Sequence, residues 1–283
     1  MKSDPSYLAN VEVVYLLGIG GIGMSALARY FKHQGKFVLG YDKTRTALTI
    51  ELEIEGMELN YQDSALEIPE LIHRTPQEKI LVIYTPAIPK ESVLLNWFFT
   101  QGFRIEKRSA VLGLITAGSR TIAVAGTHGK TTTSCMISHL LQHAGRGCNA
   151  FLGGISTNYG SNLIVGPADA WTVVEADEYD RSFLTLSPTI SVITSMDPDH
   201  LDIYGNATAM SESYQAFADR LNDEGQLFYR FGLPLRHDSN YVSSSYGIGN
   251  DAKHACSIRV PGDGRFLLEY KGDDALWPDI ELG

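Results

Sequence analysis

The chain is poor in cysteine, in long apolar runs and in clustered basic residues. Its three cysteines are an odd number without CxxC spacing, which argues against a disulfide framework and a zinc site and favours a reducing compartment. No apolar stretch reaches the roughly 18 residues of a membrane-spanning helix, and the first residues lack a signal-peptide core. The net charge is −10 without a run of basic residues, so no nucleic-acid partner is expected. We therefore expect a cytoplasmic protein with no membrane span.

The composition is that of an ordinary globular protein, with 44% apolar and 20% charged residues. A length of 283 residues favours two domains. Residues 105–108 lead into a helix predicted at 109–116, and we place the boundary there, between domains at 1–107 and 108–283. Composition leaves the oligomeric state open.

The sequence TIAVAGTHGKTTT, at residues 121–133, has the layout of a phosphate-binding loop. Residues 121–125 are apolar and mostly β-branched or small, as in a buried strand, and the run ends at Gly126. A helix is predicted to follow, and its apolar residues share one face: Met136, Ile137, Leu140, Leu141 and Ala144. Glycines let backbone N–H groups approach phosphates, a helix N-terminus attracts anions, and a lysine and a threonine can bind phosphate oxygens and Mg²⁺. The loop is shorter than the general P-loop, because the position expected for its first glycine is Val124, within the strand.

A second glycine-rich loop, GIGGIGM at residues 18–24, follows the apolar segment 11–17. Glycines at its first, third and sixth positions satisfy GxGxxG, and Asp42 follows the strand predicted at 37–41, where a Rossmann unit binds a ribose hydroxyl. This context favours a bound nucleotide diphosphate over glycines that serve only tight helix–strand packing. NAD, FAD and a UDP-sugar all remain open, because each carries a pyrophosphate and a ribose.

Thr85 and Ala87 follow another predicted strand, at residues 80–84. Ligands of parallel α/β sheets bind at the carboxyl ends of strands, so both residues are candidates to line the same crevice. An ordinary proline-bounded turn is the alternative.

Two further strand ends carry oxygen and imidazole side chains. The apolar run 171–174 leads into EADEYD, and the run 189–194 leads into SMDPDHLD. ATP phosphates carry Mg²⁺, which prefers oxygen ligands, and a carboxylate at the end of a later strand completes its shell in other NTPases. Glu175 directly ends its strand, and we therefore assign it a metal role.

The other acids of these segments are less certain. Asp177, Glu178 and Asp180 fit either a metal site, a solvated loop or a helix N-cap. His200, next to Asp199, is a candidate metal ligand, with a structural histidine as the alternative.

The remainder of the chain indicates core and short strands. One helical stripe is predicted to be buried: Met210, Tyr214, Phe217, Ala218 and Leu221. Short strands are predicted around Leu227, Val242, Ile258 and Leu267, with a hairpin turn at 261–264 between the last two.

Five segments together resemble one family. In chain order they are GIGGIGM (18–24), TPAIP (85–89), GTHGKTTT (126–133), EADEYDRSF (175–183) and TSMDPDHLDIYG (194–205). Each is weak alone, but the combination resembles the Mur ligases over nearly the whole chain. The resemblance implies an α/β fold, with an N-terminal Rossmann-like parallel-sheet domain followed by a P-loop α/β ATP-binding domain with a small added β region.

The resemblance is specifically to the member that joins L-alanine to UDP-N-acetylmuramate with ATP and Mg²⁺. It implies that the sugar nucleotide is bound by Gly18, Gly20, Gly21, Ile22, Gly23, Met24, Asp42, Thr85 and Ala87. It implies that the ATP phosphates are bound by Gly126, Thr127, His128, Gly129, Lys130, Thr131 and Thr132. The γ-phosphoryl group would move to the lactyl carboxylate, and the amine of L-alanine would attack the resulting acyl phosphate. Lys130 would neutralise phosphate charge, Thr131 and Glu175 would bind the first Mg²⁺, and His200 would belong to a second metal site.

The chain departs from the family pattern in three ways. Tyr179 stands where the family usually has Ser, and Ser195 where it usually has Asn, so substrate contacts near both are in doubt. No lysine lies between Lys130 and Lys253, so the carbamylated lysine of several relatives is not expected. The C-terminal domain of the family is also absent, and we expect sugar-nucleotide binding without completed ligation.

Three alternatives remain. The first is the recycling ligase that attaches a tripeptide to the same sugar nucleotide, although GGIGM argues against it. An NAD-dependent oxidoreductase would explain GxGxxG but leaves the 126–133 loop, Glu175 and His200 unexplained. A non-catalytic UDP-sugar-binding fragment would need neither Lys130 nor Thr131.

Overall fold

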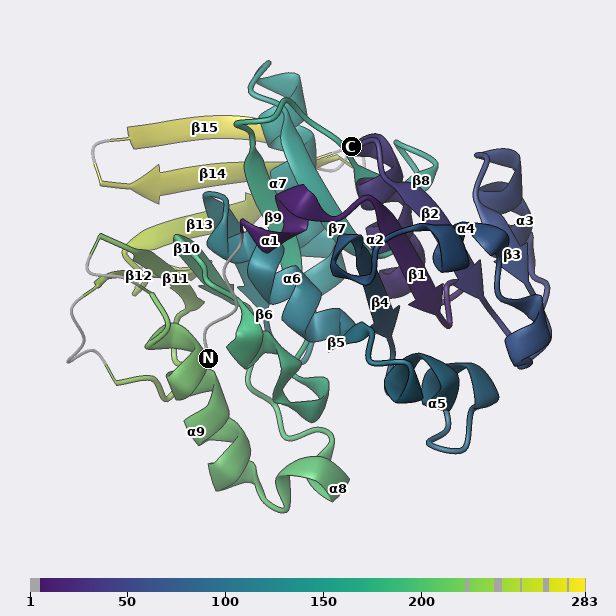
Figure 1. The fold of residues 1–283 in the computed structure, drawn as a ribbon. Coiled ribbons are helices and arrows are strands. Elements are labelled where there is room, and N and C mark those ends of the chain that lie inside the picture. Colours follow the sequence, from purple (N-terminus) through teal and green to yellow (C-terminus); the bar gives the residue numbers. More distant parts are fainter. Residues whose placement is uncertain are drawn as a thin grey trace. The chain divides into compact units, whose positions relative to one another are not determined.

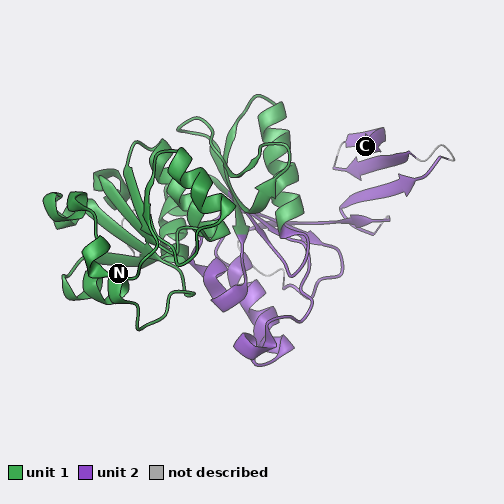
Figure 2. Ribbon diagram, turned by 90° about the vertical axis from the view of Figure 1, so that its right-hand side faces the viewer, with its two compact units in different colours: residues 1–121, 131–175 green, residues 122–130, 176–283 purple. Residues whose placement is uncertain are grey.

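The computed structural model describes residues 6–221, 224–236, 241–249, 251–261, 265–273 and 275–282. The chain forms two compact units (Figure 2). Unit 1 consists of residues 1–121 and 131–175, and unit 2 of residues 122–130 and 176–283. These units group residues by contact, so the domain boundary predicted after residue 107 stays a prediction.

The first sheet of unit 1 is parallel throughout, in the strand order β3-β2-β1-β4-β5. Its strands are β1 (Val13–Leu17), β2 (Phe37–Tyr41), β3 (Glu58–Asn60), β4 (Ile80–Tyr84) and β5 (Arg104–Lys107). Every residue of β1 is buried, because a central parallel strand is covered on both faces. This order is that of a Rossmann half, which confirms the predicted fold of the N-terminal segment.

Helices α2 to α5 lie in the connections between these strands, while α1 precedes β1 and α6 follows β5 (Figure 1). They are α1 (Tyr7–Asn10), α2 (Ile22–His33), α3 (Ala47–Ile54), α4 (Glu70–Arg74), α5 (Val93–Thr100) and α6 (Arg108–Ala117), with short 3₁₀ turns at Ala65–Glu67 and Gln77–Lys79. The core of this sheet includes Tyr15, whose ring lies 4.8 Å from that of Phe98. Its buried hydroxyl accepts a hydrogen bond from Asn60 Nδ2 at 3.1 Å, which satisfies the polar end of an otherwise apolar side chain.

The rest of unit 1 is a helix and three strands. They are α7 (Lys130–His143, of which Lys130 is in unit 2), β7 (Cys148–Ser156), β8 (Ser161–Ile164) and β9 (Trp171–Ala176, of which Ala176 is in unit 2). Strand β7 runs parallel to β9 and antiparallel to β8.

The apolar face predicted for α7 is not the buried one. Met136 and Leu140 are 61% and 66% exposed, whereas Ser134 and Ser138 are fully buried. Ser138 donates its hydroxyl to the Ser134 carbonyl at 2.7 Å, so its polar group is satisfied within the helix. Small side chains on the inner face let this helix pack closely, and a pattern based on hydrophobicity alone does not detect such a face.

Unit 2 contains a sheet in the order β15-β14-β13-β12-β11-β10-β6. Its strands are β6 (Thr121–Ala125, of which Thr121 is in unit 1), β10 (Ile190–Ile193), β11 (Gln226–Arg230), β12 (Val242–Ile248), β13 (His254–Arg259), β14 (Phe266–Gly272) and β15 (Ala275–Leu282). The pairs from β6 to β13 are parallel and the last two pairs are antiparallel. The short strands predicted here are confirmed, while residues 262–264 of the predicted hairpin turn lie outside the described residues.

The helices of unit 2 are the 3₁₀ segment η3 (Tyr179–Thr185), α8 (Leu201–Tyr204) and α9 (Ala207–Ala218). The predicted stripe of α9 and its C-terminal extension is buried, as Met210, Tyr214, Phe217, Ala218 and Leu221 are at most 8% exposed. Among the helices described in either unit, none is long and apolar enough to cross a membrane.

Candidate functional site

The first glycine-rich loop lies in unit 1 at the carboxyl end of β1. Gly18 has a φ of +85°, and a Cβ there would lie 2.7 Å from Thr85 Cγ2. Gly20 donates its N–H to Asp42 Oδ2 at 2.8 Å. Asp42 and Thr85, both predicted from sequence, therefore lie against this loop. The first turn of α2 contains no acidic residue, so its N-terminal N–H groups face no negative side chain of their own helix.

The remaining residues predicted for this site begin α2 or follow β4. Gly21 is the N-cap of α2, and its first turn starts with Ile22, Gly23 and Met24, of which Met24 is buried. Ala87 is exposed in the turn after β4, which the Ile88 N–H closes on the Thr85 carbonyl at 3.0 Å. Thr85 and Ala87 thus both belong to this turn, and Thr85 also contacts the loop. The ligand role of Ala87 stays a prediction.

Arg108 is a residue of this site that sequence reasoning missed. It begins α6 directly after β5, and a Cβ at Gly23 would lie only 2.5 Å from its Nη1 atom. The guanidinium therefore lies over the first turn of α2, where a basic group and a helix N-terminus both favour an anion. A basic residue directly after a strand of a Rossmann sheet is the signal that could have indicated it.

The phosphate-type loop of unit 2 is fixed by the end of β10. Thr194 donates its hydroxyl to the His128 carbonyl at 2.5 Å and to the Ala125 carbonyl at 3.1 Å. The His128 N–H donates to Ser195 Oγ at 2.8 Å, and Thr127 Oγ1 donates to the Asp197 carbonyl at 2.8 Å. Ser195, a departure from the family pattern, thus supports this loop.

Lys130, the loop lysine, contacts a buried carboxylate. Its ammonium lies 2.9 and 2.8 Å from the two carboxylate oxygens of Glu178 and donates to the Gly126 carbonyl at 2.8 Å. The Glu178 side chain is only 1% exposed and that of Lys130 17%. Glu178 is therefore neither a solvated loop residue nor a side-chain cap, since it makes no capping hydrogen bond to η3. Sequence alone had not distinguished it from its acidic neighbours.

Thr131 and Glu175, predicted as metal ligands, lie together in unit 1. Thr131 Oγ1 donates to Glu175 Oε2 at 3.0 Å, and the Gly153 N–H donates to Glu175 Oε1 at 2.5 Å. A Cβ at position 153 would lie 2.5 Å from Glu175 Oε2, so a larger residue there would displace this carboxylate. A hydroxyl beside a carboxylate is a donor set that suits a hard cation such as Mg²⁺, with water and phosphate oxygens completing the shell. Thr132, the next residue, is exposed.

His200, the third predicted ligand, lies in unit 2 as the N-cap of α8 with a φ of +51°. Its Nε2 atom lies 3.8 Å from Asp199 Oδ2, and its ring meets that of Tyr179 edge-on, with centroids 5.4 Å apart. Within the described part of the chain, no group of three or more His, Cys, Asp and Glu side chains could hold a metal ion. Glu175 belongs to unit 1, so any metal shell that includes both residues remains a prediction.

Two buried tyrosines of unit 2 contact Glu178 and the phosphate-type loop. The Tyr204 hydroxyl donates to the Glu178 carbonyl at 2.5 Å, and that of Tyr214 lies 3.5 Å from Thr127 Oγ1. Burial, followed by the charge of Glu178, raises the pKa of Tyr204 to about 12. Burial also raises the pKa of Tyr214, so both tyrosines stay neutral at physiological pH.

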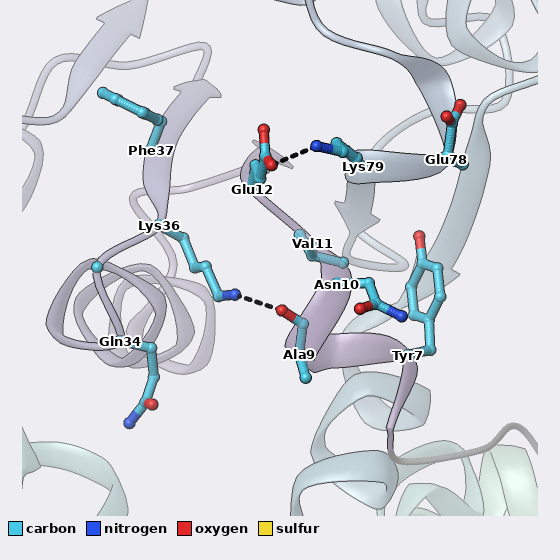
Figure 3. Close-up of a pocket in the computed structure, with 11 residues that line it drawn as sticks. Tyr7, Ala9, Asn10, Val11, Glu12, Gln34, Lys36, Phe37, Glu78 and Lys79 are labelled. Atoms are coloured by element: carbon cyan, nitrogen blue, oxygen red, sulfur yellow. Dashed lines mark hydrogen bonds and ion pairs between the residues drawn. The ribbon is translucent and has the colours of Figure 1, made fainter.

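A cavity of about 690 Å³ lies at the opposite end of the Rossmann sheet (Figure 3). Its walls come from the amino ends of β1, β2 and β4. Its basic groups are used internally: Lys79 pairs with Glu12 at 2.6 Å, and Lys36 donates to the Ala9 carbonyl at 3.1 Å. Ligands of this fold bind at the carboxyl ends of strands, so the cavity is not the candidate site.

Comparison with known proteins identifies Mur ligase domains along the chain, in agreement with the family resemblance of the sequence motifs. The family described as "Mur ligase family, catalytic domain" matches residues 13–120, and "Mur ligase middle domain" matches residues 124–265. A protein of Cytophaga hutchinsonii named UDP-N-acetylmuramate–L-alanine ligase is 45% identical over 279 residues, which are 97% of this chain and 59% of that relative. A protein of the same name from Flavobacterium psychrophilum is 49% identical over 277 residues, again 59% of its length.

A solved structure shows the same fold. The UDP-N-acetylmuramate-alanine ligase of Thermotoga maritima superposes with a TM-score of 0.78 at 25% identity, over 95% of this chain and 60% of that one. The chain belongs to the Mur ligase family. It spans about 59% of the length of the curated relatives it matches.

Proposed function

We propose that this chain binds UDP-N-acetylmuramate and ATP as part of a ligase that joins L-alanine to the sugar's lactyl carboxylate, in peptidoglycan precursor synthesis. The observation that carries the proposal is the pairing of a phosphate loop with the EADE segment. Lys130 lies beside Glu178 and the adjacent Thr131 beside Glu175. Relatives at 45% and 49% identity bear the name of this ligase, which supports L-alanine over a tripeptide as the acceptor.

In the first domain, the 18–24 loop would bind the pyrophosphate of the UDP-sugar. The N-terminal N–H groups of α2 and the guanidinium of Arg108 supply positive potential at one place. Asp42 fixes the loop through Gly20, next to where a ribose would bind.

In the central domain, Lys130 would neutralise charge on the β/γ-phosphates, and Thr131 with Glu175 would bind Mg²⁺. Mg²⁺, when bound, screens the repulsion between phosphate and acceptor carboxylate. The His200 role at a second metal rests on the family resemblance, with the Tyr179 ring as its neighbour.

The proposed reaction proceeds in two steps. The lactyl carboxylate oxygen attacks the γ-phosphorus, which forms an acyl phosphate and releases ADP. The amine of L-alanine then attacks the acyl carbon, loses a proton and expels inorganic phosphate. Lys130 and the backbone of the loop contribute by positioning the phosphates and stabilising their charge. A cytoplasmic location belongs to the same proposal, because ATP and UDP-sugars are cytoplasmic metabolites.

Calorimetric titration tests the proposal directly. We expect heat on adding UDP-N-acetylmuramate, further heat with ATP and Mg²⁺, and none with NAD. An NAD signal without a UDP-sugar signal would overturn the assignment.

We further propose that this chain alone does not complete ligation, since it spans only 59% of the length of its relative from Cytophaga hutchinsonii. Phosphate release that depends on L-alanine, measured with this chain, would contradict that statement. In a longer form of the protein, phosphate release with L-alanine and with the tripeptide can be compared. The substrate that supports release distinguishes the L-alanine ligase from the recycling ligase.

A further inference from the structure

The lysine of the phosphate loop has no hydrogen-bond donor to spare. An ammonium has three N–H donors, and Lys130 lies within 2.9 Å of three acceptors, all in unit 2. One is the Gly126 carbonyl and two are the carboxylate oxygens of Glu178. An incoming phosphate oxygen can bond to Lys130 only if one of these contacts is given up.

Glu178 cannot easily move away from this lysine. Its main-chain carbonyl accepts hydrogen bonds from the Tyr204 hydroxyl at 2.5 Å and from the Arg181 N–H at 3.0 Å. Phe183, buried at 1% exposure, closes the same turn by donating its N–H to the Asp177 carbonyl at 3.0 Å. The Glu178 carboxylate is thus attached to a packed segment and buried with Lys130 as its counter-ion.

We propose that Glu178 competes with the nucleotide phosphates for Lys130, so that this buried ion pair sets the affinity of the phosphate loop. The inference rests on the proposed nucleotide-binding function. An internal carboxylate occupies the N–H donors of Lys130 that a phosphate would use. Nucleotide binding exchanges at least one Lys130–Glu178 contact for a Lys130–phosphate contact. The apparent dissociation constant is then raised by the inverse of the fraction of molecules in which Lys130 is released.

The test is calorimetry of ADP with Mg²⁺ on the parent chain and two variants. Glu178→Gln keeps the shape of the side chain but removes its charge, and we expect roughly tenfold tighter binding of ADP–Mg²⁺. Asp180→Asn is the matched control, because Asp180 is an exposed carboxylate of the same segment with a φ of +50° that Asn tolerates. It removes one charge without touching Lys130, and we expect a change of less than about twofold.

Weaker or unchanged ADP binding by the Glu178→Gln variant would overturn the proposal, because Glu178 would then position Lys130 in the loaded site or take no part. Equal tightening in both variants would also overturn it, as a general charge effect. If Glu178→Gln fails to fold, Glu178→Asp replaces it, since a carboxylate one methylene shorter cannot reach Lys130 with both oxygens. That variant is also expected to bind ADP–Mg²⁺ more tightly.

Titration of the same samples with UDP-N-acetylmuramate separates this inference from the proposed function. If the samples bind the UDP-sugar and ADP, but Glu178→Gln does not bind ADP more tightly, only the competition for Lys130 is disproved. No ADP binding in any variant defeats the nucleotide site of unit 2 and the competition together.

Discussion

Gly126 and Gly129 both have positive φ angles, +136° and +84°, but the space around them differs. A Cβ at Gly126 would overlap the Thr194 hydroxyl and lie 2.8 Å from the Ser195 backbone nitrogen. A Cβ at Gly129 would have Thr194 Cβ, at 3.8 Å, as its nearest neighbour apart from the adjoining residues. Gly126→Ala must therefore displace backbone as well as adopt a strained φ, and we expect it to cost about 3 kcal/mol or more. Gly129→Ala carries only the φ strain, about 1–2 kcal/mol. Urea denaturation of both variants measures the difference, and equal losses would contradict the argument.

Tyr204 predicts how stability changes in alkaline solution. Its pKa is about 12 in the folded protein, because of burial and then the nearby charge of Glu178, and near 10 when unfolded. The folded state therefore retains the proton that the unfolded state loses, so stability is intact below about pH 10 and falls as the pH rises toward about 12. Tyr204→Phe removes this contribution, which is at most about 1.4 kcal/mol per pH unit. Urea midpoints between pH 9 and pH 11 should fall less steeply for the variant, while identical slopes would contradict the assignment. Tyr15 and Tyr214 contribute to both proteins alike.

Glu175 predicts the Mg²⁺ dependence of nucleotide binding. Glu175→Gln keeps an oxygen for the Gly153 N–H but removes the negative charge that would bind the cation. We expect the gain in ADP affinity on adding Mg²⁺ to fall about tenfold, with metal-free binding unchanged. Calorimetry with and without Mg²⁺ gives both values. A variant that keeps the full Mg²⁺ effect would remove Glu175 from the metal site.

Residues within a motif or at the end of a predicted strand were predictable, whereas residues whose role depends on the orientation of a turn or helix were not. A strand, a glycine and a helix follow one another in the chain, so the loops at 18–24 and 126–130 could be located from local sequence. Thr131 and Glu175 were paired through the expected order of strand ends. Glu178 and Arg108 could not be assigned, because their roles depend on which side of a turn or helix faces the loop.

At the scale of elements, a single side chain connects α2 to β8 within unit 1. Asn162 is fully buried and donates to the Ile22 carbonyl at 2.6 Å and to Ser25 Oγ at 2.8 Å. Its Oδ1 atom accepts from Arg29 Nη1 at 2.6 Å. Because all these partners would lose a bond in a buried place, we expect Asn162→Ala to cost about 3 kcal/mol.

Asn96→Ala is the control for this prediction. Asn96 is an exposed amide that also donates to two carbonyls, those of Lys90 and Ser92, but water can replace it there. Its loss should cost less than about 1 kcal/mol by urea denaturation. Equal costs for the two variants would mean that Asn162 does not join the two elements.

The type of each element was predictable from its hydrophobic periodicity and its length, whereas the face that is buried was not always predictable. The strands at 37–41, 80–84 and 121–125 match their predicted ranges, because each is a short apolar run with a glycine or proline close to one of its ends: Gly35, Pro86 and Gly126. Helix α7 does not follow its pattern, since Ser134 and Ser138 form the inner face and Met136 is exposed. Small side chains occupy this face because the helix packs closely there, and such a contact is visible only in the tertiary structure.

At the scale of the whole molecule, a net charge of −10 disfavours two anionic ligands unless positive potential is concentrated locally. The two glycine loops would supply it separately, in unit 1 through the N-terminus of α2 with Arg108, and in unit 2 through Lys130 once a phosphate replaces a Glu178 contact. If each loop binds its own nucleotide, amide hydrogen exchange should slow at 18–24 on adding UDP-N-acetylmuramate and at 126–130 on adding ADP–Mg²⁺. Lys130→Met should abolish the second effect and preserve the first, because the methionine removes charge from one loop only. Protection of both loops by either ligand alone would show that the two loops do not act as independent sites.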